Sequence, residues 1–274
     1  MGLDASITMK NTRLKSACLR LAAGCAAILA CTAAPAAVPT STQKPAGVHA
    51  WGYEGELGPH HWGELDAANI TCRIGHHQSP IAIAPQAQAP HHVQAAEFHY
   101  GTVPMRLVNN GHTVEAELTQ PEKAPWIAID GKRFSLAQLH FHHPSEHTLA
   151  GKRYPMEMHL VHKSEDGKLA VVAAFIREGA ASQPLGQAFA HLPTAAAAHE
   201  AAPIAIDLSK LLPGRHDAWM YEGSLTTPPC TEGVQWIVLK KPISLSAAQI
   251  RHFSSLFPDN HRPVQSLGDR QLED

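Results

Sequence analysis

Histidines are concentrated in one part of this chain. Six of them lie in the 23 residues from His140 to His162, where the sequence reads HFHHPSEH and then, after a gap, MEMHLVH. The whole chain has 20 histidines in 274 residues, so a histidine-rich composition is one explanation. The other is a metal site, because the neutral imidazole ring is the commonest metal ligand. The spacing of the histidines distinguishes the two.

The spacing favours a metal site. His140 and His142 lie two residues apart, so on a strand both side chains point to the same face. His159 lies in a second apolar segment, and a hairpin through residues 150–152 brings the two strands together. Three neutral imidazoles that leave one coordination position open are the ligand set of catalytic zinc, whereas a structural zinc site closes all four positions. We therefore predict a catalytic zinc site.

Other side chains of the same segments support this interpretation. A ligating histidine needs a hydrogen-bond partner for its second ring nitrogen. Strand periodicity supplies Gln138 and Glu157, each two residues before a predicted ligand. His147 and His162 fit buried structural positions better than metal ligation. We expect surface or loop positions for the other histidines considered, which are His60, His61, His76, His77, His91, His92 and His143.

The elements that must position these residues are strands. Short alternating or apolar runs recur along the chain between Gly, Pro and Asn residues, including the hairpin-turn dipeptides Asn110-Gly111 and Asp130-Gly131. Helical patterns are scarce and best at residues 184–192, which residues 195–198 extend, and at 246–253. We predict a mainly β, mostly antiparallel fold with a few short helices. The predicted strands are 105–108, 113–118, 127–129, 138–142, 156–161, 170–176 and 235–239.

Composition excludes some classes of partner. The chain has 24 acidic and 22 basic residues, so it has no strong net field, and neither nucleic acid nor a membrane surface is indicated. Hydrophobic residues make up 44% and charged residues 17%, which is typical of a globular chain. Without its N-terminal segment the chain keeps about 235 residues and shows no internal repeat, which indicates one domain.

The N-terminal segment predicts export. A basic region follows Met9, an alternative start, residues 21–37 carry no charge, and APA at 34–36 is a small-residue cleavage site. We predict a signal peptide at 1–36, a linker at 37–48, a folded domain at 49–274 and a periplasmic or secreted product. The mature chain would then not be inserted in a membrane. A retained transmembrane helix and a lipoprotein anchored at Cys31 are the alternatives.

The cysteines agree with export. Cys18, Cys25 and Cys31 lie in the predicted signal peptide, which leaves Cys72 and Cys230 in the mature chain. Two cysteines of an exported protein most simply pair with each other. Two free thiols and an intermolecular bridge remain as alternatives.

Further motifs give a resemblance to a known family. Besides HFH, SEH and MEMHLVH, the chain contains WGY at 51–53, QSPI at 78–81, NNGH at 109–112, SLTTPP at 224–229, VQWIVL at 234–239 and NHRPVQ at 260–265. Over nearly all of the mature chain it resembles the α-class carbonic anhydrases. The resemblance implies a large twisted, mostly antiparallel β-sheet with zinc in a conical cleft. It also implies reversible hydration of carbon dioxide to bicarbonate and a proton by zinc-bound hydroxide.

The resemblance implies roles for individual residues of the reaction centre. His140, His142 and His159 match the zinc ligands of the family. Thr226 matches the residue that accepts a hydrogen bond from the hydroxide, and Glu146 matches the carboxylate that accepts the proton of Thr226. Because a hydroxyl group donates only one hydrogen bond, this arrangement would aim the nucleophile.

Other positions match the family around that centre. His112 matches its proton-shuttle histidine, and Cys72 and Cys230 match the disulfide of exported members. Glu115 departs from the family pattern, in which an amide is usual at this position near the cleft. The expected substrate-binding positions form a largely apolar wall suited to carbon dioxide, and they are Val161, Val171, Leu225, Trp236 and Thr227.

Two other functions fit parts of the sequence. Non-catalytic relatives on this fold lose at least one zinc histidine, but this chain keeps all three together with Thr226 and Glu146. A zinc-storage protein would explain the histidine content, although storage needs neither the threonine nor an apolar pocket. The expected partner is therefore a small molecule, carbon dioxide or bicarbonate, and a homodimer remains open.

Overall fold

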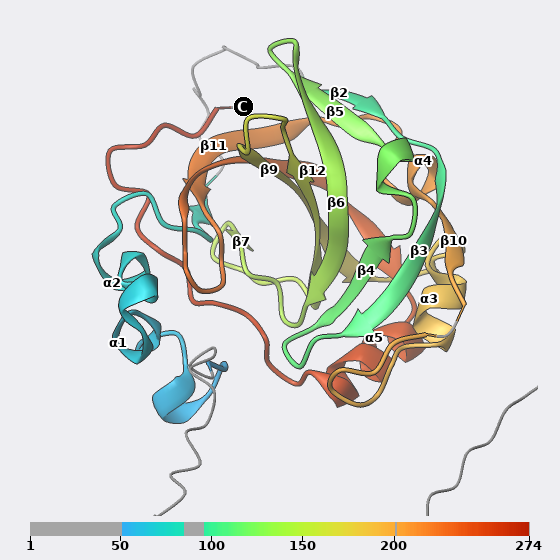
Figure 1. Ribbon diagram of the computed structural model, residues 1–274, viewed down its shortest axis with the longest axis horizontal. Coiled ribbons are helices and arrows are strands. Elements are labelled where there is room, and N and C mark those ends of the chain that lie inside the picture. The colour runs from blue at the N-terminus through green and yellow to red at the C-terminus, as the bar shows by residue number, and fades with distance from the viewer. Residues whose placement is uncertain (1–50, 85–95, 201, 274) are drawn as a thin grey trace, which may run out of the picture. The chain divides into compact units, whose positions relative to one another are not determined.

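The computed structural model describes residues 51–84, 96–200 and 202–273 (Figure 1). The predicted signal peptide, linker and domain start, and also His91 and His92, lie outside these residues. The strands are β1 (Ala82–Ile83), β2 (Glu97–His99), β3 (Thr102–Asn109), β4 (Val114–Leu118), β5 (Trp126–Ile129), β6 (Lys132–His142), β7 (Thr148–Leu149), β8 (Met156–Lys163), β9 (Leu169–Glu178), β10 (Ile204–Asp207), β11 (Ala218–Ser224) and β12 (Glu232–Leu245). The α-helices are α1 (Trp62–Leu65), α2 (Thr71–Ile74), α3 (Gly186–Ala190), α4 (Leu208–Leu211) and α5 (Ala247–Leu256), and 3-10 turns lie at Gly55–Leu57, Ala67–Asn69 and Pro121–Lys123.

One large sheet organises the described residues. Ten strands form it, in the order β10-β3-β4-β6-β8-β9-β12-β11, and β5 and β2 extend it beside β6. Its strand pairs are antiparallel except for β9 and β12, which run parallel. The predicted mainly β, mostly antiparallel fold is confirmed, and Figure 1 shows the strong twist of the sheet. β1 and β7 form a separate parallel pair.

Two hairpins use the dipeptides that the sequence marks as turns. Asp130 and Gly131 both have positive φ, 50° and 74°, and join β5 to β6. Gly111, with φ of 88°, lies in the connection from β3 to β4. A residue without a side chain adopts this backbone region without steric cost. The second hairpin matters for function because it carries His112.

The central strands are buried on both faces because an apolar cluster covers each face of the sheet. The larger cluster includes Leu139 and Phe141 of β6 and Leu160 of β8, and α3 and α5 add to it. The smaller cluster lies on the opposite face and consists of Ile81, Ile83, Val171, Ala173, Phe175, Trp219, Tyr221, Val234, Trp236 and Val238. Since side chains alternate along a strand, His140 and His159 share the face of the smaller cluster.

The two predicted helices are present, but one predicted extension is wrong. Ser246 caps α5 and forms a capping box with Gln249, as the sequence SAAQ favours. Phe189 of α3 packs against Phe253 of α5, and Figure 1 shows these two helices together. Residues 195–198 are not helical. Their backbone instead bonds to the end of β3: Asn109 N–H donates to the Ala198 carbonyl.

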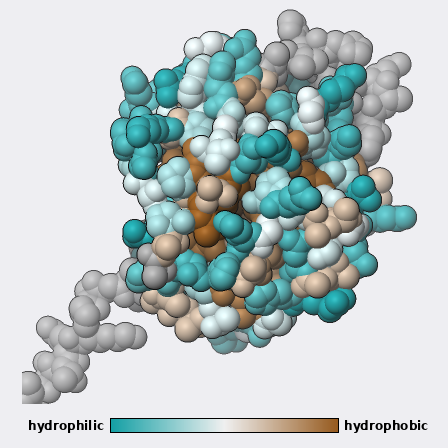
Figure 2. Space-filling view, turned by 90° about the vertical axis from the view of Figure 1, so that its right-hand side faces the viewer, coloured by the Kyte–Doolittle hydropathy of each residue, from teal (hydrophilic) through white to brown (hydrophobic). Residues whose placement is uncertain are grey.

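The surface and one covalent link complete the fold. A disulfide joins Cys72 in α2 to Cys230, 158 residues further along the chain. On the face drawn in Figure 2, hydrophilic residues surround a central strip of apolar ones, as expected where polar side chains cover a core. None of the helices among the described residues has the length and apolar character needed to cross a membrane.

Candidate metal centre and active site

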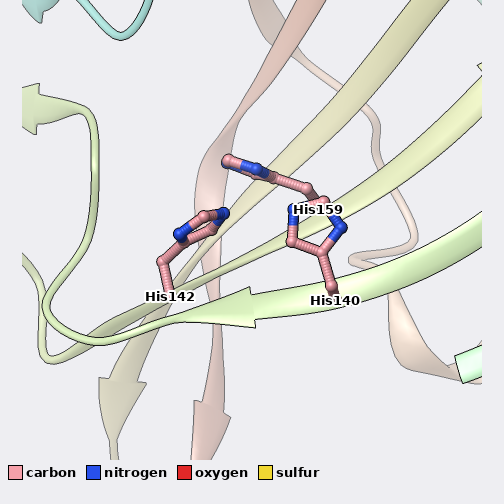
Figure 3. A group of neighbouring side chains, drawn as sticks. All are labelled: His140, His142 and His159. Carbon is pink, nitrogen blue, oxygen red and sulfur yellow. The ribbon is translucent and has the colours of Figure 1, made fainter. Parts of the chain in front are cut away.

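Three histidines converge on one point of the sheet. His140 and His159 are directly opposite each other in the register of β6 and β8, and His142 follows two residues along β6 on the same face. The ligand nitrogens of the three lie within 4.8 Å of one another. Figure 3 shows the rings of His140 and His142 rising from one strand and meeting that of His159.

Each of these rings uses one nitrogen for a hydrogen bond that fixes its orientation. The bonds join His140 Nδ1 to Gln138 Oε1 (2.8 Å), His142 Nδ1 to the Asn260 carbonyl (2.7 Å) and His159 Nε2 to Glu157 Oε1 (2.8 Å). His142 Nε2 is buried and has no hydrogen-bond partner. Leaving a buried polar atom unpaired costs about 1–3 kcal/mol. A metal ion at the common point would remove this cost.

The environment keeps two of these rings neutral. Burial, followed by the charges of His142 and His159, lowers the pKa of His140 well below its usual value. Burial is also the main cause of the lowered pKa of His142, and the nearby Glu146 opposes it. Because only a neutral imidazole can coordinate a metal ion, the donor set fits a divalent cation that accepts nitrogen ligands.

A buried polar chain supports His159 from behind. The ring of His147 donates from Nδ1 to Glu157 Oε1 (2.7 Å), and its Nε2 lies 2.7 Å from the hydroxyl of Tyr221. Burial alone would raise the pKa of Glu157, but the charge of His147 and the hydrogen bonds from both histidines hold it well below its usual value. His147, Glu157 and His159 are also close enough to hold a metal. Their facing atoms already bond to one another, so this group fixes the position of His159.

Glu146 lies beside the three histidines with one oxygen occupied. The backbone N–H of Arg262 donates to Glu146 Oε1 at 2.8 Å. Oε2 is buried without a hydrogen-bond partner and lies 3.5 Å from His142 Nε2 and 3.9 Å from His159 Nδ1. Thr226 is buried, but the hydrogen bond expected from it to Glu146 is not formed in this structure. Oε2 is thus an open acceptor next to the candidate metal centre.

His112 lies on the connection between β3 and β4 and is half-buried. Its ring stacks on that of Trp51, with the ring centroids 3.6 Å apart and the planes 6° from parallel. Burial lowers the pKa of His112. The side-chain amide of Asn260 donates to the His112 carbonyl at 2.9 Å, while the carbonyl of Asn260 accepts the hydrogen bond from His142. Asn260 therefore connects the His112 loop to His142, one of the three converging histidines.

The predicted apolar wall is assembled on the same face as the histidines. Val171 and Trp236 belong to the smaller cluster, and the partly buried Val161 and Leu225 pack against it. The ring centroid of Trp236 is 5.0 Å from that of His159. Thr227 is half-buried in the loop after β11, where its carbonyl accepts a hydrogen bond from the Cys230 N–H at 2.9 Å.

Sequence patterns missed several residues that shape the site. Asn260 and Arg262 lie in the loop after α5, and Tyr221 lies on β11. Trp51 is the first residue that the structure describes. The motifs NHRPVQ and WGY contain three of these four residues, but no spacing rule assigns them a role. Their contacts join segments more than 60 residues apart, so only the folded chain shows them.

Comparisons with known proteins agree with this geometry. The family model for eukaryotic-type carbonic anhydrase matches residues 57–274. A carbonic anhydrase of Klebsiella pneumoniae is 47% identical over 221 residues, covering 80% of this chain and 89% of that protein, and one of a Nostoc species is 42% identical over 224 residues, covering 80% and 84%. The structure of the α-carbonic anhydrase from Thermovibrio ammonificans with the inhibitor sulfanilamide superposes with a TM-score of 0.78 at 40% identity, covering 83% of this chain and all of that one.

The chain therefore belongs to the eukaryotic-type, or α-class, carbonic anhydrases. It is an enzyme that hydrates carbon dioxide, and this finding favours catalysis over a non-catalytic or storage role.

Proposed function

We propose that His140, His142 and His159 hold one zinc ion at which carbon dioxide is reversibly hydrated to bicarbonate and a proton. The observation that carries this proposal is the arrangement of the ring nitrogens. One nitrogen of each ring is hydrogen-bonded, and the other is left for a shared ligand. When bound there, zinc lowers the pKa of a coordinated water to about 7, a value established for carbonic anhydrase itself.

Thr226 and Glu146 orient the attacking water in this proposal. Glu146 Oε2 is buried and has no hydrogen-bond partner, so it can accept the hydroxyl proton of Thr226 once that side chain turns toward it. The lone pairs of Thr226 are then the only part of its hydroxyl available to the water, and they must accept a hydrogen bond from it. Arg262 holds the other carboxylate oxygen, which keeps Glu146 aimed.

The apolar wall binds the substrate. Carbon dioxide is uncharged and forms only weak hydrogen bonds, so an apolar surface next to the attacking water suits it better than polar anchors. Val161, Val171, Leu225 and Trp236 supply this surface, and the backbone of the Leu225 loop is closed by a hydrogen bond from the Leu225 N–H to the Thr231 carbonyl at 2.9 Å. Thr227 would contact the substrate from the same loop.

His112 carries the released proton to solvent. A group whose pKa is close to the working pH exchanges protons well in both directions, and histidine is such a group. The ring is half-buried and therefore reachable by water on one side. Its stacking on Trp51 stabilises one position of the ring, from which it would accept the proton through water.

Stopped-flow hydration of carbon dioxide by the zinc-loaded mature chain tests these assignments. Thr226→Ala should keep one zinc per chain and lose at least about a hundredfold in kcat/KM, because the water is no longer oriented. His112→Ala should instead lower kcat in dilute buffer, leave kcat/KM nearly unchanged and recover with added imidazole. A Thr226→Ala enzyme with the parental rate would contradict the orienting role, and a lack of imidazole rescue would leave His112 a structural residue.

We propose further that the chain is exported to the periplasm or beyond after cleavage near residue 36. The Cys72–Cys230 disulfide supports this, since such bonds persist in oxidising compartments. The mass of the mature, non-reduced protein from its natural host tests both points. An uncleaved N-terminus, a lipid-modified Cys31 or two alkylatable thiols would contradict the proposal.

A further inference from the structure

Glu115 is a half-buried acidic residue of β4. Among the described residues its carboxylate forms neither a hydrogen bond nor an ion pair. Burial, with a smaller contribution from Glu117, raises the pKa of Glu115 to about 7. Burying a charged group without compensation costs free energy. A glutamine here would avoid that cost, so folding gives no reason for the carboxylate.

The position of Glu115 relates it to the candidate metal centre. In the sheet register Glu115 is directly opposite His140, which is directly opposite His159, so the three form one row across β4, β6 and β8. The neighbours Val114 and Ala116 pack into the larger apolar cluster on the other face. The Glu115 side chain therefore lies on the face of the histidines, where directly opposite residues have Cβ atoms about 5 Å apart.

No lysine or arginine in this row neutralises Glu115. Its partner on the other side, in β3, is Val108, whereas the exposed Glu117 is opposite Arg106. The two acidic residues of β4 therefore differ. Glu117 is in solvent with a basic residue across from it, and Glu115 is next to the ligand histidines with an apolar neighbour. A charge in the less hydrated position acts more strongly on its surroundings.

We propose that Glu115 is a specificity-determining residue that lowers the affinity of the metal centre for small anions relative to neutral ligands. The inference rests on the proposed zinc site. Carbon dioxide is neutral and is not repelled by the carboxylate, whereas bicarbonate and inorganic monoanions are. The same charge attracts the zinc cation, so one residue favours retention of the metal and release of anionic ligands.

Binding calorimetry on the zinc-loaded mature chain at about pH 8.5, where the carboxyl group is ionised, provides the first test. The probes are azide, a monoanion, and imidazole, which is neutral at that pH. Glu115→Gln should bind azide about three- to tenfold more tightly, while imidazole binding stays within about twofold. Glu117→Gln is the matched control and should change neither, because an exposed charge is screened. Glu115→Asp keeps the charge and should behave like the parent.

Zinc affinity of the metal-free chain, measured by competition with a chelator, gives a second readout of opposite sign. Glu115→Gln should bind zinc about three- to tenfold more weakly. A residue that only shapes the site would move azide, imidazole and zinc in the same direction, and that result would overturn the proposal, as would unchanged azide binding. A parent chain that binds no zinc at the three histidines would instead refute the zinc site, and this inference with it.

Discussion

Two histidines of the same strand show what separates a candidate metal ligand from a structural residue. His159 and His162 both lie on β8, and both are buried. Being three residues apart, they point to opposite faces of the sheet. His159 donates to the carboxylate of Glu157 and faces two other histidines, whereas His162 Nε2 lies 2.7 Å from the hydroxyl of Tyr100.

The difference lies in the neighbours and not in burial. Tyr100 packs against the larger apolar cluster, so His162 has a neutral partner in an apolar environment, and burial lowers its pKa to about 4. Glu157 gives His159 a charged partner, which would raise the basicity of the ring as the proposed metal ligand. A buried histidine is therefore a ligand candidate when its free nitrogen meets other donors, as in His140, His142 and His159, and for His159 an anionic partner adds to this.

The largest expected effect is on zinc binding, which should depend on His159 and not on His162. His159→Ala removes one of three ligands and should abolish stoichiometric zinc binding and nearly all hydration activity, whereas His162→Gln should keep one zinc per chain and near-parental activity. Metal analysis and stopped-flow assays of both variants measure this. Full zinc occupancy in His159→Ala, and likewise in the alanine variants of His140 and His142, would refute the ligand assignment.

The next prediction concerns His162 on the other face of the sheet and its effect on how the free energy of unfolding depends on pH. The pKa of His162 is about 4 in the folded chain, against about 6.5 when unfolded. The unfolded chain therefore takes up this proton first, so stability is lost as the pH falls from about 6.5 to about 4, by about 3 kcal/mol in all from this residue. Above pH 6.5 the residue adds no pH dependence.

Urea unfolding at several pH values checks this sign and size. His162→Gln should show a flatter decline between pH 6.5 and 4 even if its stability at pH 7 is lower, because the slope reports only the missing titration. A variant with the same slope as the parent would show that His162 does not titrate as the structure implies.

Local pattern predicted much of this molecule. The alternation of β6 and β8 placed His140, His142 and His159 on one face, and the same periodicity supplied Gln138 and Glu157 as ring partners. The two turn dipeptides were also predicted. Each of these features depends on residues close together in sequence, where side-chain direction follows directly from secondary structure.

Several features of the fold and the site could not be predicted, mostly because they depend on contacts between segments that are distant in the sequence. β10 and β11 were not predicted, because β10 has only four residues and β11 contains Glu222 and Gly223 near its end. The parallel pairing of β9 with β12 has no local signal. Asn260 and the orientation of Glu146 by Arg262 are likewise contacts across the chain. The resemblance to a family located their motifs, but only the fold gave them roles.

The smallest expected effect concerns Glu157, the hydrogen-bond partner of His159, and tests whether its charge sets His159 apart from His162. Glu157→Gln removes the negative charge behind His159 and should weaken zinc binding about 10- to 100-fold, as is typical when the outer partner of a ligand histidine is changed. It should also lower stability, because an amide nitrogen cannot accept the hydrogen bond that the backbone N–H of His147 gives to Glu157 Oε2 at 2.9 Å.

His162→Gln is the control that separates these two consequences. Both substitutions disturb buried hydrogen bonds of β8, and both should reduce the free energy of unfolding. Only Glu157→Gln removes the anion that distinguishes the two faces, so chelator competition should find weaker zinc binding in that variant alone. Equal losses of zinc affinity in the two variants would show that the general rigidity of β8, and not the carboxylate, tunes the metal site. In that case the contrast between the two histidines would be one of position only.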